Sequence, residues 1–237
     1  MCNKNIKYLE WDSDFFQKKI GTISGDSDNF EESLNNAKSE GYQLIYLFSN
    51  INLTIDNKVL KQFNGHLADR KVLYEKTIMP LDLIKKDAFI IEYKDDKLTP
   101  ELEKLAYLSG EHSRYKHDKN FKENDFYRLY KIWMENSIKH LIADKVFVVI
   151  ENNSVKGMVT LKIDKEKGQI GLISVLPSAQ GKGYGKTLVN NCEIELAKQG
   201  INRLEVPTQA NNKLACQFYE KYGFQIKSIT NIYHFWL

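Results

Sequence analysis

The chain of 237 residues has few cysteines, few prolines and no long hydrophobic run. Cys2, Cys192 and Cys216 are an odd set without the paired spacing of a metal site, so we expect reduced thiols and no metal centre. No stretch approaches the roughly 18 apolar residues of a membrane-spanning helix. The N-terminal residues also lack the apolar core of a secretory signal. These absences predict a cytoplasmic protein without membrane insertion.

The net charge is also small. Lysine and arginine total 34 and aspartate and glutamate total 31, which gives a charge of +3 with the two signs interspersed. Such a balance gives no reason to expect nucleic-acid binding. The hydrophobic content of 42% and the charged content of 27% are typical of globular proteins. The chain is long for one ordinary domain and can bury large cores.

The most informative segment is a glycine-rich turn, Gln-Gly-Lys-Gly-Tyr-Gly-Lys, at residues 180–186. The aliphatic run 169–175 before it ends near Pro177 and reads as a strand. Apolar residues after it recur at helical spacing, which predicts a helix. Alternating glycines let backbone N–H groups surround an anion, and the start of the helix adds its positive dipole end. The turn therefore predicts a phosphorylated cofactor, and a pyrophosphate fits it best.

Three phosphate-binding patterns compete for this turn. A Walker loop needs a glycine at the position of Gln180, and a dinucleotide fingerprint needs one at the position of Lys186, so both fail. The pattern Gln/Arg-x-x-Gly-x-Gly/Ala is met by Gln180, Gly183 and Gly185. With this spacing the segment resembles the coenzyme A pyrophosphate loop of the GNAT superfamily of N-acetyltransferases.

A second motif, at residues 212–224, resembles the closing motif of the same superfamily. Asn212 and Tyr219 are seven residues apart, so they share one side of a predicted helix. Gly223 suits the C-terminal cap, and Phe224 enters a strand. One helix and one strand, residues 203–208, separate the two motifs, as the superfamily order requires. The apolar face of the second helix consists of Leu214, Ala215, Phe218 and Tyr222.

The resemblance implies an α/β (α+β) fold, a mixed and mostly antiparallel sheet with splayed central strands. We expect the acetyltransferase domain at residues 87–237 and a smaller N-terminal α/β domain at 1–86, which contributes to the substrate site. Periodicity predicts strands at 20–24, 44–48, 72–80, 89–93, 146–150, 155–163, 169–175, 203–208 and 225–237. It predicts helices at 29–39, 57–64, 100–109 and 124–138, besides those that follow the two motifs.

Three shorter segments carry a narrower resemblance. Residues 9–16, 113–115 and 126–137 resemble the TDP-fucosamine acetyltransferase family, whose members acetylate a 4-amino-4,6-dideoxy sugar carried on TDP. This implies acetyl transfer from acetyl-CoA to a nucleotide-linked amino sugar, as in polysaccharide biosynthesis. Gln17 stands where that family has a glycine after the paired phenylalanines. Gln180 stands where arginine is common, but backbone groups hold most of the phosphate charge.

The resemblance also assigns roles to residues. Tyr219 is implied as the general acid that protonates the thiolate of coenzyme A, and Arg114 and Tyr115 as substrate contacts, with Arg114 on the TDP pyrophosphate. Trp11, Phe15 and Phe16 are further candidates for packing against sugar or thymine. The implied cofactor-binding residues are Ile173, Ser174, Val175, Gln180, Gly181, Lys182, Gly183, Tyr184, Gly185, Lys186 and Asn212.

Several alternatives remain open. In the first alternative, the protein acetylates the amine of another small molecule or of a peptide. In the second, it binds coenzyme A but has no catalytic activity. Tyr219 is either the general acid or an aromatic residue of the core. Cys216 is better explained as a packing residue than as a covalent acyl-cysteine nucleophile, because no base lies near it in sequence. His112 and His117 are either bases or solvated loop residues. A homodimer is possible, and the epimer of the sugar is not fixed.

Overall fold

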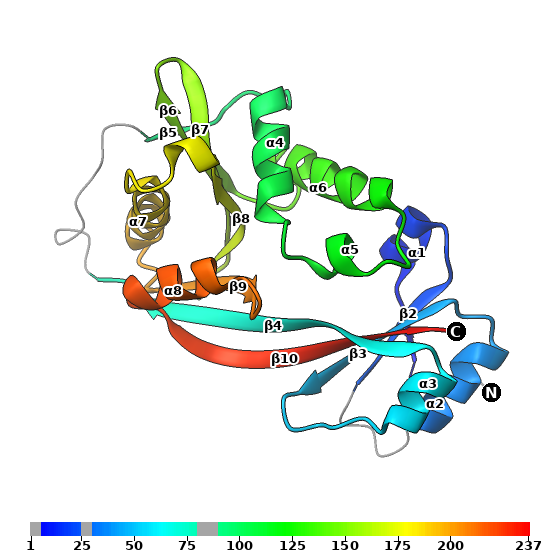
Figure 1. The fold of residues 1–237 in the computed structure, drawn as a ribbon. Helices are drawn as coiled ribbons and strands as arrows, with labels where there is room; N and C mark the ends of the chain where they lie inside the picture. Colours follow the sequence, from blue (N-terminus) through cyan, green and yellow to red (C-terminus); the bar gives the residue numbers. More distant parts are fainter. Residues whose placement is uncertain (1–5, 25–29, 80–89) are drawn as a thin grey trace.

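The computed structural model describes residues 6–24, 30–79 and 90–237, and Figure 1 shows the arrangement of their elements. The strands are β1 (Lys7–Tyr8), β2 (Ile20–Ser24), β3 (Leu44–Asn50), β4 (Gly65–Thr77), β5 (Ile90–Glu92), β6 (Lys145–Glu151), β7 (Ser154–Ile163), β8 (Gly168–Val175), β9 (Arg203–Gln209) and β10 (Gln225–Trp236). The α-helices are α1 (Glu10–Phe16), α2 (Phe30–Ser39), α3 (Asn57–Gln62), α4 (Pro100–Ser109), α5 (Arg114–His117), α6 (Glu123–Ile138), α7 (Tyr184–Ala197) and α8 (Lys213–Lys221).

The described strands form one ten-stranded sheet in the order β1-β2-β3-β10-β4-β9-β8-β7-β6-β5. Neighbours run antiparallel except in the pairs β2–β3 and β8–β9. The predicted mixed, mostly antiparallel sheet is therefore confirmed.

Helices cover both faces of the sheet around β6, β7 and β8. On one side α4 and α6 pack on the sheet, and α7 lies on the other (Figure 1). Val146 and Val148 belong to the core cluster under α4 and α6, whereas Phe147 and Val149 belong to the cluster under α7. Because successive side chains of a strand point to opposite faces, a strand buried on both faces needs this unbroken apolar run.

The two ends of the chain meet in the same sheet. β10, the last strand, lies between β3 and β4 and pairs antiparallel with both. The expected domain boundary after residue 86 falls outside the described residues. Strands on both sides of it nevertheless share one continuous sheet, and the long strands β4 and β10 run side by side (Figure 1). The division into two domains stays a prediction.

The expected elements match the observed ones closely, with four main differences. The pattern did not predict the short strand β1 or the helices α1 and α5, and it placed the start of β4 at residue 72 instead of Gly65. Residues 65–71 are mostly polar and small, and they become a strand because β10 pairs with them from Phe235 to Thr230. Long-range pairing overrides local preference here.

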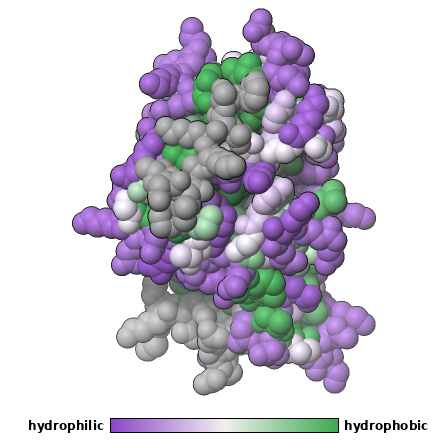
Figure 2. Space-filling model, turned by 90° about the vertical axis from the view of Figure 1, so that its left-hand side faces the viewer, coloured by the Kyte–Doolittle hydropathy of each residue, from purple (hydrophilic) through white to green (hydrophobic). Residues whose placement is uncertain are grey.

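No described helix combines the length and the apolar character needed to cross a membrane. Figure 2 shows the face that is on the left in Figure 1. Hydrophilic side chains predominate on it, and hydrophobic ones gather in small separate groups.

Candidate functional site

The site begins where two parallel strands separate. β8 and β9 are partners only at Gly168–Leu204 and Gln169–Glu205, although β8 continues to Val175 and β9 to Gln209. Beyond Gln169 no described strand pairs with the edge of β8 that faces β9, although Nε2 of Gln180 donates to the carbonyl of Val175 at 3.3 Å. Other backbone groups of this edge can bind another molecule. This is the expected splay of the central strands.

Two cavities lie at the splay. The first, which we call the loop cavity, has a volume of about 480 Å³ and lies against the glycine-rich turn. The second, which we call the inner cavity, has a volume of about 210 Å³ and lies between β8, β9, β4 and the helices α4 to α6. Ile173, Ala215 and Tyr219 line both cavities, so the two meet at these three residues.

The backbone of the glycine-rich turn suits an anion. Gly181 and Gly183 have φ angles of +79° and +85°, which side-chain-bearing residues rarely adopt. Gly183 is the N-terminal cap of α7, so N–H groups of the first turn of this helix are directed at the loop cavity. Nine of the residues expected to bind the cofactor line this cavity: Ile173, Ser174, Val175, Gln180, Gly181, Gly183, Tyr184, Gly185 and Lys186.

The two remaining expected residues lie elsewhere. Nζ of Lys182 is 2.8 and 3.0 Å from the carboxylate oxygens of Glu151, and Lys182 does not line the loop cavity. Asn212 lines the inner cavity, and its side-chain oxygen accepts a hydrogen bond from the N–H of Ala215 at 3.1 Å. Asn212 is therefore the N-terminal cap of α8, a role in which its side chain stabilises the helix that carries Tyr219.

The wall of the inner cavity is charged. Asp69 and Lys71 of β4 and Arg114 of α5 line it together with Tyr115. Nη2 of Arg114 donates to the hydroxyl of Tyr115 at 2.6 Å, and its guanidinium carbon lies 5.1 Å from the centre of the Tyr46 ring. Both of the expected substrate residues, Arg114 and Tyr115, thus reach this cavity.

One buried polar atom of this wall, Nε of Arg114, has no hydrogen-bond partner among the described residues. Buried polar groups normally bond to something, so an orphan beside a cavity points to a polar ligand. Burial also raises the pKa of Asp69 to about 6 and lowers the pKa of Lys71. A carboxylate with such a pKa readily exchanges a proton near neutral pH.

Tyr219 is a buried aromatic as well as a cavity residue. Its ring packs against Tyr74 and Phe224, with centroid distances of 5.6 and 5.5 Å. Burial raises the pKa of Tyr219 above its ordinary value, so the phenol stays protonated at neutral pH. The ring thus belongs to the core while it lines the junction of the two cavities.

Other sequence candidates do not line either cavity. Phe15 and Phe16 are buried in the core, and Trp11 stacks on Phe15 at 5.1 Å. Sγ of Cys216 is 3.7 Å from the carbonyl oxygen of Gln209, and Cys216 lines neither cavity. The same holds for His117, whose Nε2 is 2.9 Å from the carbonyl oxygen of Glu111.

Sequence reasoning missed Asp69 and Lys71. The two residues alternate along β4 and therefore point to the same face of the sheet. Recognition of residues 65–71 as part of a strand would have placed both charges on one face. The missing signal was the pairing with β10, which lies about 160 residues further along the chain.

The comparisons with known proteins agree with this geometry. The model of the acetyltransferase (GNAT) family matches residues 107–224, from the last turn of α4 to the start of β10. A ribosomal protein bS18-alanine N-acetyltransferase of Haemophilus influenzae is 28% identical over 120 residues, which are 46% of this chain and 82% of that protein. A mycothiol acetyltransferase of Beutenbergia cavernae is 29% identical over 93 residues, which are 39% of this chain and 30% of that protein.

Solved structures share the whole fold at low identity. A conserved protein of unknown function from Staphylococcus epidermidis aligns with a TM-score of 0.67 and 10% identity, over 100% of this chain and 92% of its own. A GCN5-related N-acetyltransferase from Sphaerobacter thermophilus aligns with a TM-score of 0.61 and 14% identity, over 97% of this chain and 75% of its own. From this family match, the related enzymes and the splayed sheet, the protein is an acetyltransferase of the GNAT superfamily.

Proposed function

We propose that the protein transfers the acetyl group of acetyl-CoA to the amine of a nucleotide-linked amino-deoxy sugar of the TDP-4-amino-4,6-dideoxyhexose type. One observation carries this proposal. The loop cavity, suited to a pyrophosphate, and the inner cavity, suited to a charged acceptor, meet at Ile173, Ala215 and Tyr219. A thioester placed at this junction lies within reach of an amine in the inner cavity.

The loop cavity suits coenzyme A. Backbone N–H groups of Gly181, Gly183 and the first turn of α7 bind the pyrophosphate, and Lys186 adds a positive charge. The free edge of β8 binds the pantetheine arm, and its N–H groups polarise the thioester carbonyl. A donor of this kind is worth about 10²–10³ in rate. Leu214, a residue that is 77% exposed, gives the bound cofactor an apolar surface to cover.

The reaction needs two proton transfers. The amine nitrogen forms a bond to the acetyl carbon while the carbon–sulfur bond breaks. Tyr219 gives its proton to the departing sulfur, a role for which its raised pKa keeps it protonated. Asp69 takes the proton that the nitrogen loses, because its pKa of about 6 leaves it ionised at neutral pH but still basic.

The charges of the inner cavity favour an acceptor that is itself anionic. Arg114 and Lys71 line it together, and Nε of Arg114 has no partner among the described residues. A planar guanidinium binds phosphate oxygens through paired hydrogen bonds. The diphosphate of a nucleotide sugar is such a group. The volume of about 210 Å³ suits the amino-sugar end of the acceptor, with the nucleotide outside it.

A direct assay tests the proposal. Purified protein is incubated with acetyl-CoA and a TDP-4-amino-4,6-dideoxyhexose, and free thiol and product mass are followed together. Equal release of thiol and gain of one acetyl group in the sugar is the expected result. A protein that binds acetyl-CoA but acetylates no such sugar contradicts the proposed acceptor.

A second acceptor follows from one of the relatives. The Haemophilus influenzae relative is named for the alanine of a ribosomal protein, and the matched segment covers 82% of it. A peptide with an N-terminal alanine therefore belongs in the assay beside the sugar nucleotide. Such a peptide offers no phosphate to Arg114, so we expect it to be the poorer acceptor.

A further inference from the structure

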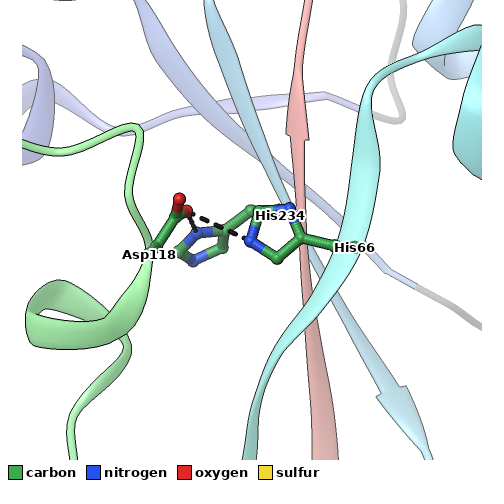
Figure 3. Close-up of side chains that lie close together, drawn as sticks. All are labelled: His66, Asp118 and His234. Carbon is green, nitrogen blue, oxygen red and sulfur yellow. Dashed lines mark hydrogen bonds and ion pairs between the residues drawn. The ribbon is translucent and has the colours of Figure 1, made fainter.

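Outside the two cavities, two histidines and an aspartate converge on one point (Figure 3). His66 of β4 and His234 of β10 are directly paired in the antiparallel register. Their side chains therefore leave the same face of the sheet. Asp118 follows α5 and points at both imidazole rings (Figure 3). One potential ligand atom from each residue lies within 4.8 Å of the others.

We propose that His66, Asp118 and His234 bind one divalent transition-metal ion of the Zn²⁺ class. Oδ2 of Asp118 is 2.6 Å from Nδ1 of His234 and 3.4 Å from Nε2 of His66. Ligand atoms that share a tetrahedral zinc ion at about 2.0–2.1 Å are about 3.3 Å apart, so these two pairs need shifts below about 1 Å. Two imidazoles and one carboxylate form a ligand set that such ions prefer, with a further position for water.

More nitrogen atoms surround the carboxylate of Asp118 than this carboxylate can accept hydrogen bonds from. The backbone and side-chain nitrogens of Asn120 bind Oδ1 at 3.0 and 2.9 Å. His234, His66 and Nε1 of Trp236, the last at 2.9 Å, all approach Oδ2. A carboxylate has about four lone-pair sites, two on each oxygen, so Oδ2 cannot accept three full hydrogen bonds.

A cation relieves this crowding. An ion placed between Oδ2 and the two imidazoles binds one lone pair of Oδ2 and one nitrogen of each histidine. The other lone pair of Oδ2 then accepts the hydrogen bond from the N–H of Trp236. The two bonds from Asn120 then hold the ligating carboxylate in position, as outer-shell partners of metal sites do.

An ion can reach this cluster from solvent, and its binding would affect the inner cavity. The side chain of His66 is 40% exposed, whereas those of Asp118 and His234 are buried, so an ion enters beside His66. The N–H of Asp118 donates to the carbonyl of Arg114 at 2.9 Å. A bound ion thus fastens α5, with the charged residue that lines the inner cavity, to β4 and β10.

Metal titration of the full chain tests this site. Tag-free protein is treated with a chelator, freed of it, and titrated with Co²⁺ for its visible absorption and with Zn²⁺ by calorimetry. We expect one ion per chain, with an absorption spectrum of low-coordinate cobalt. In His66→Gln a polar amide stays beside Asp118 but does not replace the imidazole as a ligand. Loss of an outer-shell partner already costs about tenfold or more in metal affinity, so loss of this ligand should lower the affinity by at least about tenfold.

A matched control separates the cluster from ordinary surface binding. His140→Asn also removes one histidine; this residue is exposed, and Asn tolerates its φ of +57°. It should bind the ion as the wild type does. Zn²⁺ should raise the thermal midpoint of the wild type and of His140→Asn but not of His66→Gln, and circular dichroism checks that each is folded. No uptake by the wild type overturns the proposal, and so does uptake that His66→Gln leaves unchanged.

Discussion

At the scale of single residues, Tyr219 is both a buried ring and a candidate acid. Its ring packs against Tyr74 and Phe224 while it lines the junction of both cavities. A substitution that removes only the hydroxyl separates these roles, because the ring and its packing remain.

We therefore expect Tyr219→Phe to lower kcat by about 10²–10⁴, the usual contribution of a positioned acid. Acetyl-CoA affinity, measured by calorimetry, should change little. Tyr233→Phe is the matched control, since Tyr233 is also buried but lines neither cavity. Undiminished turnover in Tyr219→Phe would remove the acid role and leave Tyr219 as a core aromatic.

Asp69 gives a prediction on pH. Burial raises the pKa of this carboxyl to about 6. As a base it works only when ionised, so kcat/KM of the wild type should fall as the pH drops below about 6 and level off above it. Asp69→Asn cannot take the proton and should show a low rate without this inflection. A pH profile of kcat/KM for both proteins decides, because that parameter reports groups of the free enzyme. An inflection that persists in the variant assigns the titration to another group.

At the scale of elements, the glycine-rich turn joins backbone conformation to binding. Gly183 begins α7 with φ of +85°, and apart from its neighbours in the chain no atom of the described residues lies within 4 Å of a Cβ built there. Alanine at this position meets no clash inside the protein. Its costs are a strained φ and a methyl group beside the anion-binding N–H groups.

We expect Gly183→Ala to weaken acetyl-CoA binding by about tenfold or more, since a loss of about 1.4 kcal/mol is enough for that factor. Gly200→Ala is a matched control: its φ is +72°, it too has open space around a built Cβ, and it lies after α7 at the other end of that helix. Both variants should lose about 1–2 kcal/mol of stability from strain. Only Gly183→Ala should lose affinity in calorimetry; equal affinities would exclude the turn as the cofactor site.

Local signals predicted most of these elements. The turn at residues 180–186 and the helix from Asn212 were recognisable because glycines and a cap fix short segments directly. The acceptor wall was not recognisable in the same way. Asp69 lies in a polar stretch that becomes a strand only through its pairing with β10. The convergence of His66, Asp118 and His234 also depends on tertiary contacts that no spacing reveals.

At the scale of the whole molecule, one buried carboxylate links distant parts of the chain. Glu205 of β9 is buried, and its oxygens are each 2.6 Å from an ammonium nitrogen, one of Lys167 and one of Lys227. Lys227 of β10 also lies 2.6 Å from Glu75 of β4. This network ties together four segments at the place where β8 and β9 are still paired through Gln169. It stabilises the end at which β8 and β9 are still paired, away from the loop cavity and the inner cavity.

The network makes stability depend on pH. Burial opposes the charge of Glu205, but hydrogen bonds from Lys167 and Lys227 outweigh it and hold the pKa of Glu205 below its ordinary value. A lowered folded-state pKa means that the ionised group stabilises the fold above its unfolded pKa of about 4.3, and this contribution disappears as the pH falls.

Glu205→Gln should therefore lower the free energy of unfolding at pH 7 by about 1–3 kcal/mol, the range for hydrogen bonds to charged groups. The gap to the wild type, measured by urea unfolding, should narrow as the pH falls below about 4. Glu166→Gln is the control, because the Glu166–Arg203 pair is exposed and should contribute at most about 0.5 kcal/mol. If the difference in free energy of unfolding between the wild type and Glu205→Gln does not change with pH, Glu205 stabilises the junction of β4, β9 and β10 through its shape and not through its charge.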